Sequence, residues 1–446
     1  MLITPFWRSL NKKYLKNKVT QIFFYLGFFL YICHMKKRMP ELPEKIFELL
    51  MEFTNYHWIR HLLVKSHIYL VGGCVRDAYR DKPLKDIDII VEGLTLAEIK
   101  HILLPFGQVD IVGESFAVIK FKPTGYFGEP FDIAIPRTDR KTGNGHKGFD
   151  IQTKGVTIYQ DLERRDFTIN SIAIKCSSME VIDPYNGIQD IEYGILKATN
   201  SKAFIDDPLR ILRGIQFAAR FGYIFDIPTA KLMQENAHLI KDISGERIMD
   251  ELMKIIKKNG NTQIALDLLH FYDVDLALFG KKMLRYDKGL EYLDAVSFFY
   301  VLGLLGDIDP SKFILQRLKG ESSLAKNVKT LEKLFTRLPH VEHDDEDLLF
   351  MLSKCFSEAP AIMESVILPD SVQKVVLNMK MGQIPFSMKS VMLNGDDVKE
   401  ISNNYEEGKW IQDILDRVLR DALMNRFNWD DRKDSVDYLM TLLYGK

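Results

Sequence analysis

The sequence predicts an α+β protein, in which a small mixed β-sheet unit is followed by a long helical region. Short apolar segments of strand length alternate with helical periods between residues 40 and 175, which is typical of a sheet with covering helices. From residue 244 to the C-terminus, apolar residues recur almost throughout at helical spacing. We therefore expect an N-terminal extension (residues 1–34), a mixed α/β head (35–175), a neck (176–260), and a helical body and tail (261–446).

The composition is that of an ordinary globular protein. Of 446 residues, 46% are hydrophobic and 27% are charged, and the formal net charge is −1. Because the net charge is close to zero, any basic surface for a nucleic acid must be local. The four cysteines are scattered without a Cys-x-x-Cys pair, which argues against a zinc site or a disulfide framework and favours a reducing compartment.

Residues 1–34 combine a basic run with an apolar, aromatic segment at positions 21–33. That segment is shorter than the roughly 20 residues that a membrane-spanning helix needs, so we expect no stable membrane association. It is interpreted as a targeting segment or weak anchor. Alternatively, translation starts at Met35 or Met39 and the preceding residues are not part of the protein. The expected location is the cytoplasm, with organellar targeting by this extension as the alternative.

The stretch that organises the head is residues 68–77, IYLVGGCVRD, which follows an amphipathic helix predicted over residues 40–66. It predicts a buried strand, a Gly-Gly turn and a helix. Gly72 and Gly73 have no Cβ, so a ligand can approach the backbone closely there. The free N–H groups at the start of the following helix suit an anion.

The next predicted strand, residues 84–92, carries Asp86 and Asp88. Residues two apart in a strand point to the same face, so the two carboxylates project together while Ile87, Ile89 and Val91 fill the other face. Adjacent carboxylates repel unless a cation lies between them, and hard oxygen ligands suit Mg²⁺. Asp-x-Asp alone is more often a solvated strand face, and Gly-Gly alone is usually a turn. Their combination favours a nucleotidyl-transfer site.

A helix is predicted over residues 96–104, and strands over residues 108–112, 116–121 and 131–135. Asp132 interrupts the last strand. Alone, it is interpreted as an edge-strand charge, but beside the Asp-x-Asp pair it is a reasonable third carboxylate. Residues 138–150 are rich in glycine and basic residues without periodicity, which predicts a mobile loop that could close over phosphates.

Residues 162–174 are interpreted as a helix start with paired arginines. Arg164 and Arg165 could neutralise a triphosphate, and Asp166 could be an N-cap. Residues 182–187, IDPYNG, predict a turn.

Pro208 suits a first helical position, which makes Asp207 a natural N-cap. Alternatively, Asp207 and Arg210 lie on one helix face as an acceptor beside a donor. Cytosine and adenine each present an amine next to a ring-nitrogen acceptor, so such a pair would select C and A.

Beyond residue 244, helical segments include residues 265–269, 295–305, 348–355 and 410–423. The acidic run at residues 343–347 is interpreted as a loop or helix cap, since its lone His-Asp lacks further histidines at metal-ligand spacing.

With these segments in order, the chain resembles the class II tRNA nucleotidyltransferase and bacterial poly(A) polymerase family of the polymerase-β superfamily. The resemblance covers residues 68–257. It rests on LVGGCVRD with Asp86-Ile-Asp88, RRDFTIN (164–170), DPYNG (183–187), DPLR (207–210) and ERIMDEL (246–252). Residues 137–146 look like the flexible loop of CCA-adding members.

The resemblance is weaker in the tail. LNGDDVKEI (393–401) is similar to a CCA-enzyme segment, but EEGKW (406–410) replaces the usual Pro-Gly-Pro turn. LGDI (305–308) stands where some relatives carry a phosphohydrolase His-Asp, so neither phosphodiesterase nor phosphatase activity is expected. Asp206 stands where glutamate is common.

The resemblance implies a polymerase-β-like head and the addition of CCA, or part of it, to tRNA 3′ ends from CTP and ATP. It implies that two Mg²⁺ ions are held by Asp86 and Asp88, with Asp132 as the third catalytic carboxylate. The implied nucleotide-binding residues are Gly72, Gly73, Arg76, Arg165, Asp166, Asn170, Asp207, Arg210 and Arg213. Glu246 and Arg247 would brace the neck, and the helical half would bind the acceptor and T arms of tRNA. A poly(A) polymerase and a catalytically silent RNA-binding relative are the alternatives.

Overall fold

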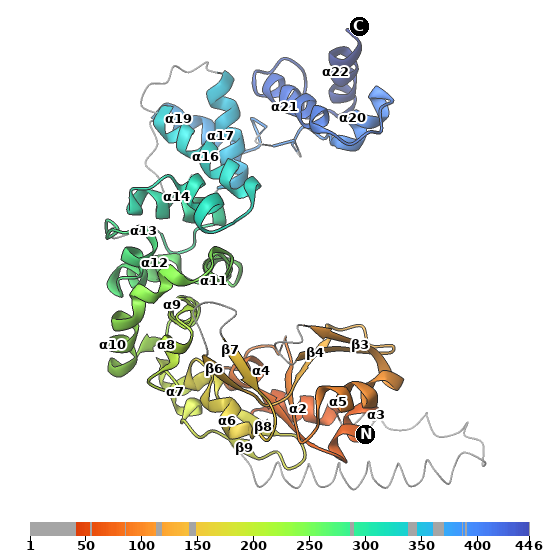
Figure 1. Cartoon of the computed structure of the whole chain (residues 1–446). Coiled ribbons are helices and arrows are strands. Elements are labelled where there is room, and N and C mark those ends of the chain that lie inside the picture. Colours follow the sequence, from red (N-terminus) through yellow and green to blue (C-terminus); the bar gives the residue numbers. More distant parts are fainter. Residues whose placement is uncertain are drawn as a thin grey trace, which may run out of the picture. The chain divides into compact units, whose positions relative to one another are not determined.

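The computed structural model describes residues 42–53, 56–84, 86–112, 118–141, 149–285, 290–337, 346–359, 370–385, 387–388 and 390–445. The chain forms two compact units, Met1–Arg210 with Tyr223–Met233, and Ile211–Gly222 with Gln234–Lys446. The first contains a mixed seven-stranded sheet and the second is helical, so the predicted α+β class is confirmed (Figure 1). Within the described ranges, no helix is both long and apolar enough to cross a membrane. The proposed extension, residues 1–34, lies outside them.

The first unit alternates short strands and helices, as the sequence predicts. Its helices are α2 (Glu44–Phe53), α3 (His57–Leu63), α4 (Gly73–Tyr79), α5 (Leu96–Leu103), α6 (Ile158–Glu163), α7 (Gly187–Tyr193) and α8 (Ala203–Asp206). Its strands are β1 (His67–Val71), β2 (Asp88–Glu92), β3 (Gly107–Val112), β4 (Val118–Pro123), β5 (Phe131–Ala134), β6 (Thr138–Lys141), β7 (Phe149–Gln152), β8 (Ala173–Lys175), β9 (Val181–Ile182), β10 (Ile195–Leu196) and β11 (Ile224–Phe225).

The large sheet has the strand order β3-β4-β5-β2-β1-β8-β9. Only β2 and β5 pair in parallel; the other neighbours are antiparallel. The register places Asp88 opposite Asp132, and Asp132 opposite Lys120 on β4. Residues opposite each other share a face, so these three polar side chains lie on one side of the sheet. On the other side, Trp58 of α3 packs against Phe121, with ring centroids 4.9 Å apart.

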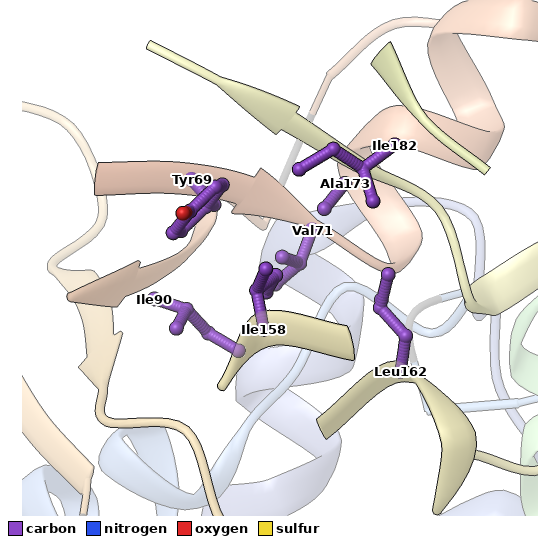
Figure 2. Close-up of a cluster of buried hydrophobic side chains, with 7 residues drawn as sticks. All are labelled: Tyr69, Val71, Ile90, Ile158, Leu162, Ala173 and Ile182. Atoms are coloured by element: carbon purple, nitrogen blue, oxygen red, sulfur yellow. The ribbon is translucent and has the colours of Figure 1, made fainter. Parts of the chain in front are cut away.

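Helix α6 packs on the sheet face that carries Asp88. Figure 2 shows its residues Ile158 and Leu162 in a buried cluster with β1, β2, β8 and β9. The cluster consists of Tyr69, Val71, Ile90, Ile158, Leu162, Ala173 and Ile182. Glu92, at the end of β2, accepts hydrogen bonds from the Tyr69 hydroxyl (2.7 Å) and from the Ile158 N–H (3.3 Å). The start of α6 is therefore tied to β2.

Two local predictions were wrong. The single helix expected over residues 40–66 is divided into α2 and α3, and the buried residues Leu50 and Trp58 lie on either side of the break. The loop expected over residues 138–150 contains the antiparallel hairpin strands β6 and β7. Basic and polar side chains carry no apolar periodicity, so backbone pairing was invisible in the sequence. Residues 142–148 lie outside the described residues.

The second unit confirms the helical prediction. Its helices are α11 (Gly245–Lys257), α12 (Thr262–Phe271), α13 (Val274–Phe279), α14 (Ala295–Gly306), α15 (Pro310–Lys312), α16 (Ser322–Arg337), α17 (Glu346–Glu358), α19 (Asp370–Lys380), α20 (Gly395–Ser402), α21 (Lys409–Leu423) and α22 (Arg432–Tyr444). Helix α9 (Leu209–Phe221) begins in the first unit and continues into the second, and α10 (Ile227–Asn236) also spans both. Of the acidic run, Glu346 and Asp347 form the first turn of α17. Residues 343–345 lie outside the described residues.

Candidate active site

The Gly-Gly turn joins β1 to α4 at one end of the sheet. Gly72 has φ +67°, a left-handed conformation that a side chain disfavours. A Cβ at Gly72 would lie 2.8 Å from Arg165 Nη1 and 3.6 Å from Asp88 Oδ2. A glycine is therefore required here both by backbone conformation and by the close approach of an arginine and a carboxylate.

The Asp88 carboxyl group has a raised pKa. Burial raises the pKa of Asp88 to about 6; Arg165 opposes the rise, and Asp132 and Asp86 add to it. Desolvation and neighbouring negative charges both disfavour the ionised form of a carboxyl group. The charge balance at Asp88 is therefore short of a cation.

Asp86 lies before β2 rather than on it, since the ladder with β1 begins at Asp88 opposite Val71. The expectation that both aspartates belong to the strand was wrong in this detail, because β2 starts at Asp88, four residues after the start of the predicted strand. Asp86 is exposed, and its charge still reaches Asp88. Asp132 is half-exposed, and its Oδ1 lies 3.0 Å from Lys120 Nζ.

The donor chemistry fits Mg²⁺ with a bound nucleotide. Within the described ranges, no three His, Cys, Asp or Glu side chains are grouped closely enough to hold a metal ion by themselves. Mg²⁺ is usually held by one or two carboxylates together with substrate phosphates. Asp86 and Asp88 can provide that number, and the raised pKa of Asp88 shows that added positive charge would be favourable there.

The paired arginines follow the end of α6. Arg164 is its C-cap, so the expected helix start at this position was wrong. Between them the two guanidinium groups hold Asp161, a carboxylate that is fully buried on α6. Burial disfavours its ionised form, but Arg165 and Arg164 outweigh that effect and hold the pKa of Asp161 below its ordinary value.

Asp161 was missed by the sequence reasoning. A carboxylate three and four residues before a pair of arginines has the spacing of helical ion pairs, and this signal was present in the sequence. This signal was not used because a helix was expected to start at residue 162, whereas α6 ends at Glu163.

Asp166, Asn170 and Arg76 form a buried network beside the arginines. Asp166 Oδ1 accepts hydrogen bonds from the Phe167 N–H (2.8 Å) and from Asn170 Nδ2 (2.9 Å). Arg76 Nη1 donates to Asn170 Oδ1 at 2.7 Å, and Arg76 Nε donates to Asp77. The network ties α4 to the 3₁₀ helix Thr168–Asn170, so these predicted site residues are brought together.

Asp207 precedes α9, and its Oδ1 accepts a hydrogen bond from the Leu209 N–H at 3.3 Å, as expected of an N-cap. Arg210 donates from Nη2 to the backbone carbonyl of Arg164 at 2.6 Å and from Nη1 to that of Ala203 at 3.4 Å. The base-reading candidates are therefore joined to the segment that holds the paired arginines.

Further predictions concern Arg213, Glu246 and the turn at residues 182–187. Arg213 belongs to the second unit, where its Nη1 lies 3.8 Å from Glu251 Oε1. Glu246 is exposed in the first turn of α11. The turn at residues 182–187 is confirmed: Asp183 accepts hydrogen bonds from the Gly187 and Ile188 N–H groups at the start of α7.

Two regions of the chain match known protein families. Residues 68–197 match the family described as "Poly A polymerase head domain", and residues 222–274 match "Probable RNA and SrmB- binding site of polymerase A". The head of this chain is therefore similar to the poly A polymerase head-domain family. This confirms the resemblance that the motifs indicate.

The chain is also similar to curated proteins that carry the name "Multifunctional CCA protein". The chain is 39% identical over 195 residues to a "Multifunctional CCA protein" of Stenotrophomonas maltophilia (strain K279a), covering 42% of this chain and 45% of the relative. It is 40% identical over 196 residues to the protein of the same name from Nitrosococcus oceani, covering 42% and 44%. The match thus spans less than half of the length of these relatives.

Solved structures match over most of the chain. The apo form II of a CCA-adding enzyme has a TM-score of 0.59 at 24% identity and covers 92% of this chain and 98% of that one. The Thermotoga maritima CCA-adding enzyme complexed with tRNA has a TM-score of 0.55 at 24% identity, covering 89% and 98%. The chain has the fold of CCA-adding enzymes.

Proposed function

We propose that this chain is a tRNA nucleotidyltransferase, which adds CCA or part of it to tRNA 3′ ends from CTP and ATP without a nucleic-acid template. The observation that carries the proposal is the position of Arg165 beside Asp88 at the Gly72 turn. A carboxylate short of a cation, an arginine and a backbone turn without side chains are the parts that a metal-bound triphosphate requires. The names of the curated relatives support CCA as the product.

In this proposal Asp86 and Asp88 hold Mg²⁺, with Asp132 as the third carboxylate. The chemistry that bound Mg²⁺ supplies is a lower pKa of the attacking 3′-hydroxyl and stabilisation of the pyrophosphate leaving group. Gly72, Gly73 and Arg76 line the approach of the triphosphate. Positioning and charge neutralisation carry nucleotidyl transfer, so no covalent intermediate is needed.

Arg165 and Asp166 contact the phosphates and ribose, and Asp207 with Arg210 reads the base. Asn170 orients Arg76, to which it is hydrogen-bonded. Arg213 is assigned to nucleotide binding with them. An acceptor beside a donor matches the edges of cytosine and adenine and mismatches those of guanine and uracil.

We assign tRNA binding to the helical body and tail. The match of residues 222–274 to an RNA-binding family supports a contact that starts at the neck. On α16, Lys326 and Lys333 are exposed, and neither forms an ion pair within the part of the chain that the structure describes. They line a groove of about 610 Å³ together with residues of α14, α17 and α21. Exposed lysines at such a groove suit the phosphates of the acceptor and T arms.

We place the protein in the cytoplasm. Of its cysteines, the described ones, Cys74, Cys176 and Cys355, are buried free thiols, which is consistent with a reducing compartment.

A poly(A) polymerase is the second candidate, favoured by the description of the head-domain family. It would share the carboxylates, the glycines and the paired arginines and differ in nucleotide choice and termination. A polymerase of this kind incorporates ATP repeatedly on arbitrary RNA and does not use CTP.

The experiment that tests the function supplies purified protein with Mg²⁺, a tRNA transcript lacking CCA, and labelled CTP and ATP separately and together. Addition of C, C and A that then stops is the expected result. Continuous ATP incorporation on arbitrary RNA would replace the proposal with a poly(A) polymerase. No incorporation by folded protein would leave an RNA-binding relative without catalysis.

A further inference from the structure

We infer that Asp161 is a positioning residue, which holds Arg165 against the Gly72 turn and Arg164 against the base-reading helix. This inference rests on the proposed nucleotidyltransferase function. It assigns a role to a residue on the buried face of α6 that the motif comparison leaves without one.

Asp161 contacts both arginines through separate oxygens. Its Oδ2 accepts hydrogen bonds from Arg165 Nη2 (3.0 Å) and Nε (3.2 Å), which is a two-point grip on one edge of the guanidinium group. Its Oδ1 accepts from Arg164 Nη2 (2.6 Å) and Nε (3.0 Å). Two donors on one edge that meet the same oxygen restrict both the distance and the direction of a guanidinium group.

The hydrogen bonds to Asp161 leave Nη1 of Arg165 directed toward the Gly72 turn. Arg165 Nη1 is not used by Asp161; it donates to the Asn170 carbonyl at 3.3 Å and is the atom that a Cβ on Gly72 would meet. The same guanidinium group is the largest favourable charge acting on Asp88. Asp161 therefore sets the direction of the positive charge that faces the carboxylate and the predicted triphosphate.

The contact between Asp161 and Arg164 extends through the Arg164 backbone to Arg210, the proposed base-reading residue. Asp161 holds the Arg164 side chain, and the Arg164 carbonyl accepts the 2.6 Å hydrogen bond from Arg210 Nη2. One buried carboxylate is thus connected to the phosphate side of the site through Arg165 and to the base side through Arg164. A displacement of this corner would disturb both.

The position of Asp161 is itself rigid. It lies between Ile158 and Leu162 on α6, both of which are in the buried cluster of the sheet. Its Oδ1 also accepts from the Arg137 N–H at 3.3 Å, so the segment between β5 and β6 also contacts this carboxylate. A buried carboxylate with this many donors is a fixed anchor, whereas the arginines are partly exposed at the site.

Asp161→Asn removes the charge and retains the size, and Asp190→Asn is the matched control. Asp190 is also buried in the first unit, and its described hydrogen bond comes from the Thr168 hydroxyl at 2.6 Å rather than from an arginine. We expect Asp161→Asn to lower kcat about 10- to 100-fold with little change in the KM for tRNA, since small misplacements of catalytic groups have effects of this size. Asp190→Asn should change kcat by less than about 3-fold.

A double-mutant cycle separates positioning from general stability. If Asp161 acts through Arg165, Asp161→Asn should reduce kcat much less in an Arg165→Ala background than in the wild type. The same fold reduction in both backgrounds, or full kcat in folded Asp161→Asn protein, would overturn the inference.

If Asp161→Asn does not fold, Arg165→Lys decides the question. Lysine keeps the charge but cannot take the two-point grip, so kcat should fall while thermal unfolding stays near that of the wild type. Wild-type kcat in this variant would overturn the inference. An inactive wild-type enzyme would instead refute the proposed function; binding of Mg²⁺–ATP, weakened by Asp161→Asn and not by Asp190→Asn, would then still test the grip.

Discussion

Asp88 and Asp132 lie opposite each other in the parallel pair of strands β2 and β5, so two carboxylates share one face of the sheet at its one parallel junction. Lys120 partly neutralises Asp132, and Arg165 partly neutralises Asp88, yet the pKa of Asp88 remains raised. A native arrangement that keeps negative charges together at a cost in stability is characteristic of a functional site. The same relationship leads to predictions about stability, pH and metal binding.

Asp88→Asn should abolish nucleotidyl transfer and at the same time stabilise the metal-free protein. In the proposed function this carboxylate holds Mg²⁺, but without the metal its charge is unfavourable because it is partly buried beside Asp132 and Asp86. We expect an increase of roughly 1–3 kcal/mol in the free energy of unfolding at pH 8. Urea unfolding in the presence of EDTA measures it; a less stable variant would contradict the assignment of a repulsive carboxylate.

The pH dependence has a defined sign. Because the pKa of Asp88 is raised in the folded state to about 6, its proton stabilises the fold at low pH, and the metal-free protein should lose stability as pH rises from about 4 to 6. Asp88→Asn should lack this component. Conversely, Mg²⁺ must compete with that proton, so its affinity should fall as pH drops below about 6. Thermal unfolding with and without Mg²⁺ across this range tests both statements, and an unchanged Mg²⁺ effect at pH 5 would contradict them.

Gly72→Ala should impair catalysis more than it impairs folding. The new methyl group meets Arg165 Nη1 at 2.8 Å, and the positive φ adds backbone strain of about 1 kcal/mol. We expect a loss of at least about 10-fold in kcat with a modest decrease in Tm. Gly125→Ala is a matched control, because Gly125 also has a positive φ but no atom lies within 4 Å of its Cβ position. Equal effects of the two substitutions on kcat would show that the contact with Arg165 is unimportant.

Arg210→Ala should weaken the selection of CTP and ATP over GTP and UTP. The substitution removes the donor of the proposed base-reading pair together with its hydrogen bonds to the Arg164 and Ala203 carbonyls. A bidentate contact to a base contributes about 1–3 kcal/mol of discrimination, so kcat/KM ratios should shift by roughly 5- to 150-fold. Competition assays with all four nucleotides provide the measurement. Unaltered ratios with lower overall activity would assign Arg210 a structural role.

Removal of the exposed lysines of α16 should weaken tRNA binding in a salt-dependent manner. The double substitution Lys326→Ala and Lys333→Ala removes two cations from the groove, and the slope of log K against log salt should decrease in magnitude by about 1–2. Lys281→Ala is the control, since Lys281 is engaged with Asp307. Filter binding at several salt concentrations measures both variants, and equal slopes would remove this groove from the proposed tRNA surface.

Features that depend on residues close in the sequence were predictable from it, and features that depend on distant residues were not. Residues 68–92 encode β1, the Gly-Gly turn, α4 and β2 locally, since apolar periodicity and glycine act over a few residues. The helices of the second unit were predictable for the same reason. The break between α2 and α3, the β6–β7 hairpin and the late start of β2 depend on packing or backbone pairing that no local pattern records.

The sequence by itself determined the fold class of this protein: its ordered motifs, its glycine turn and its aspartate pair indicate a head similar to the poly A polymerase head domain, followed by helices. Only the tertiary structure decided that Asp132 lies beside Asp88, that Arg165 faces Gly72, and that Asp161 holds the paired arginines. The first two contacts join residues more than forty positions apart, and strand order and register fix such contacts. The third contact joins residues that are close in the sequence. Its role depends on where packing against the sheet ends α6, which only the tertiary structure decides.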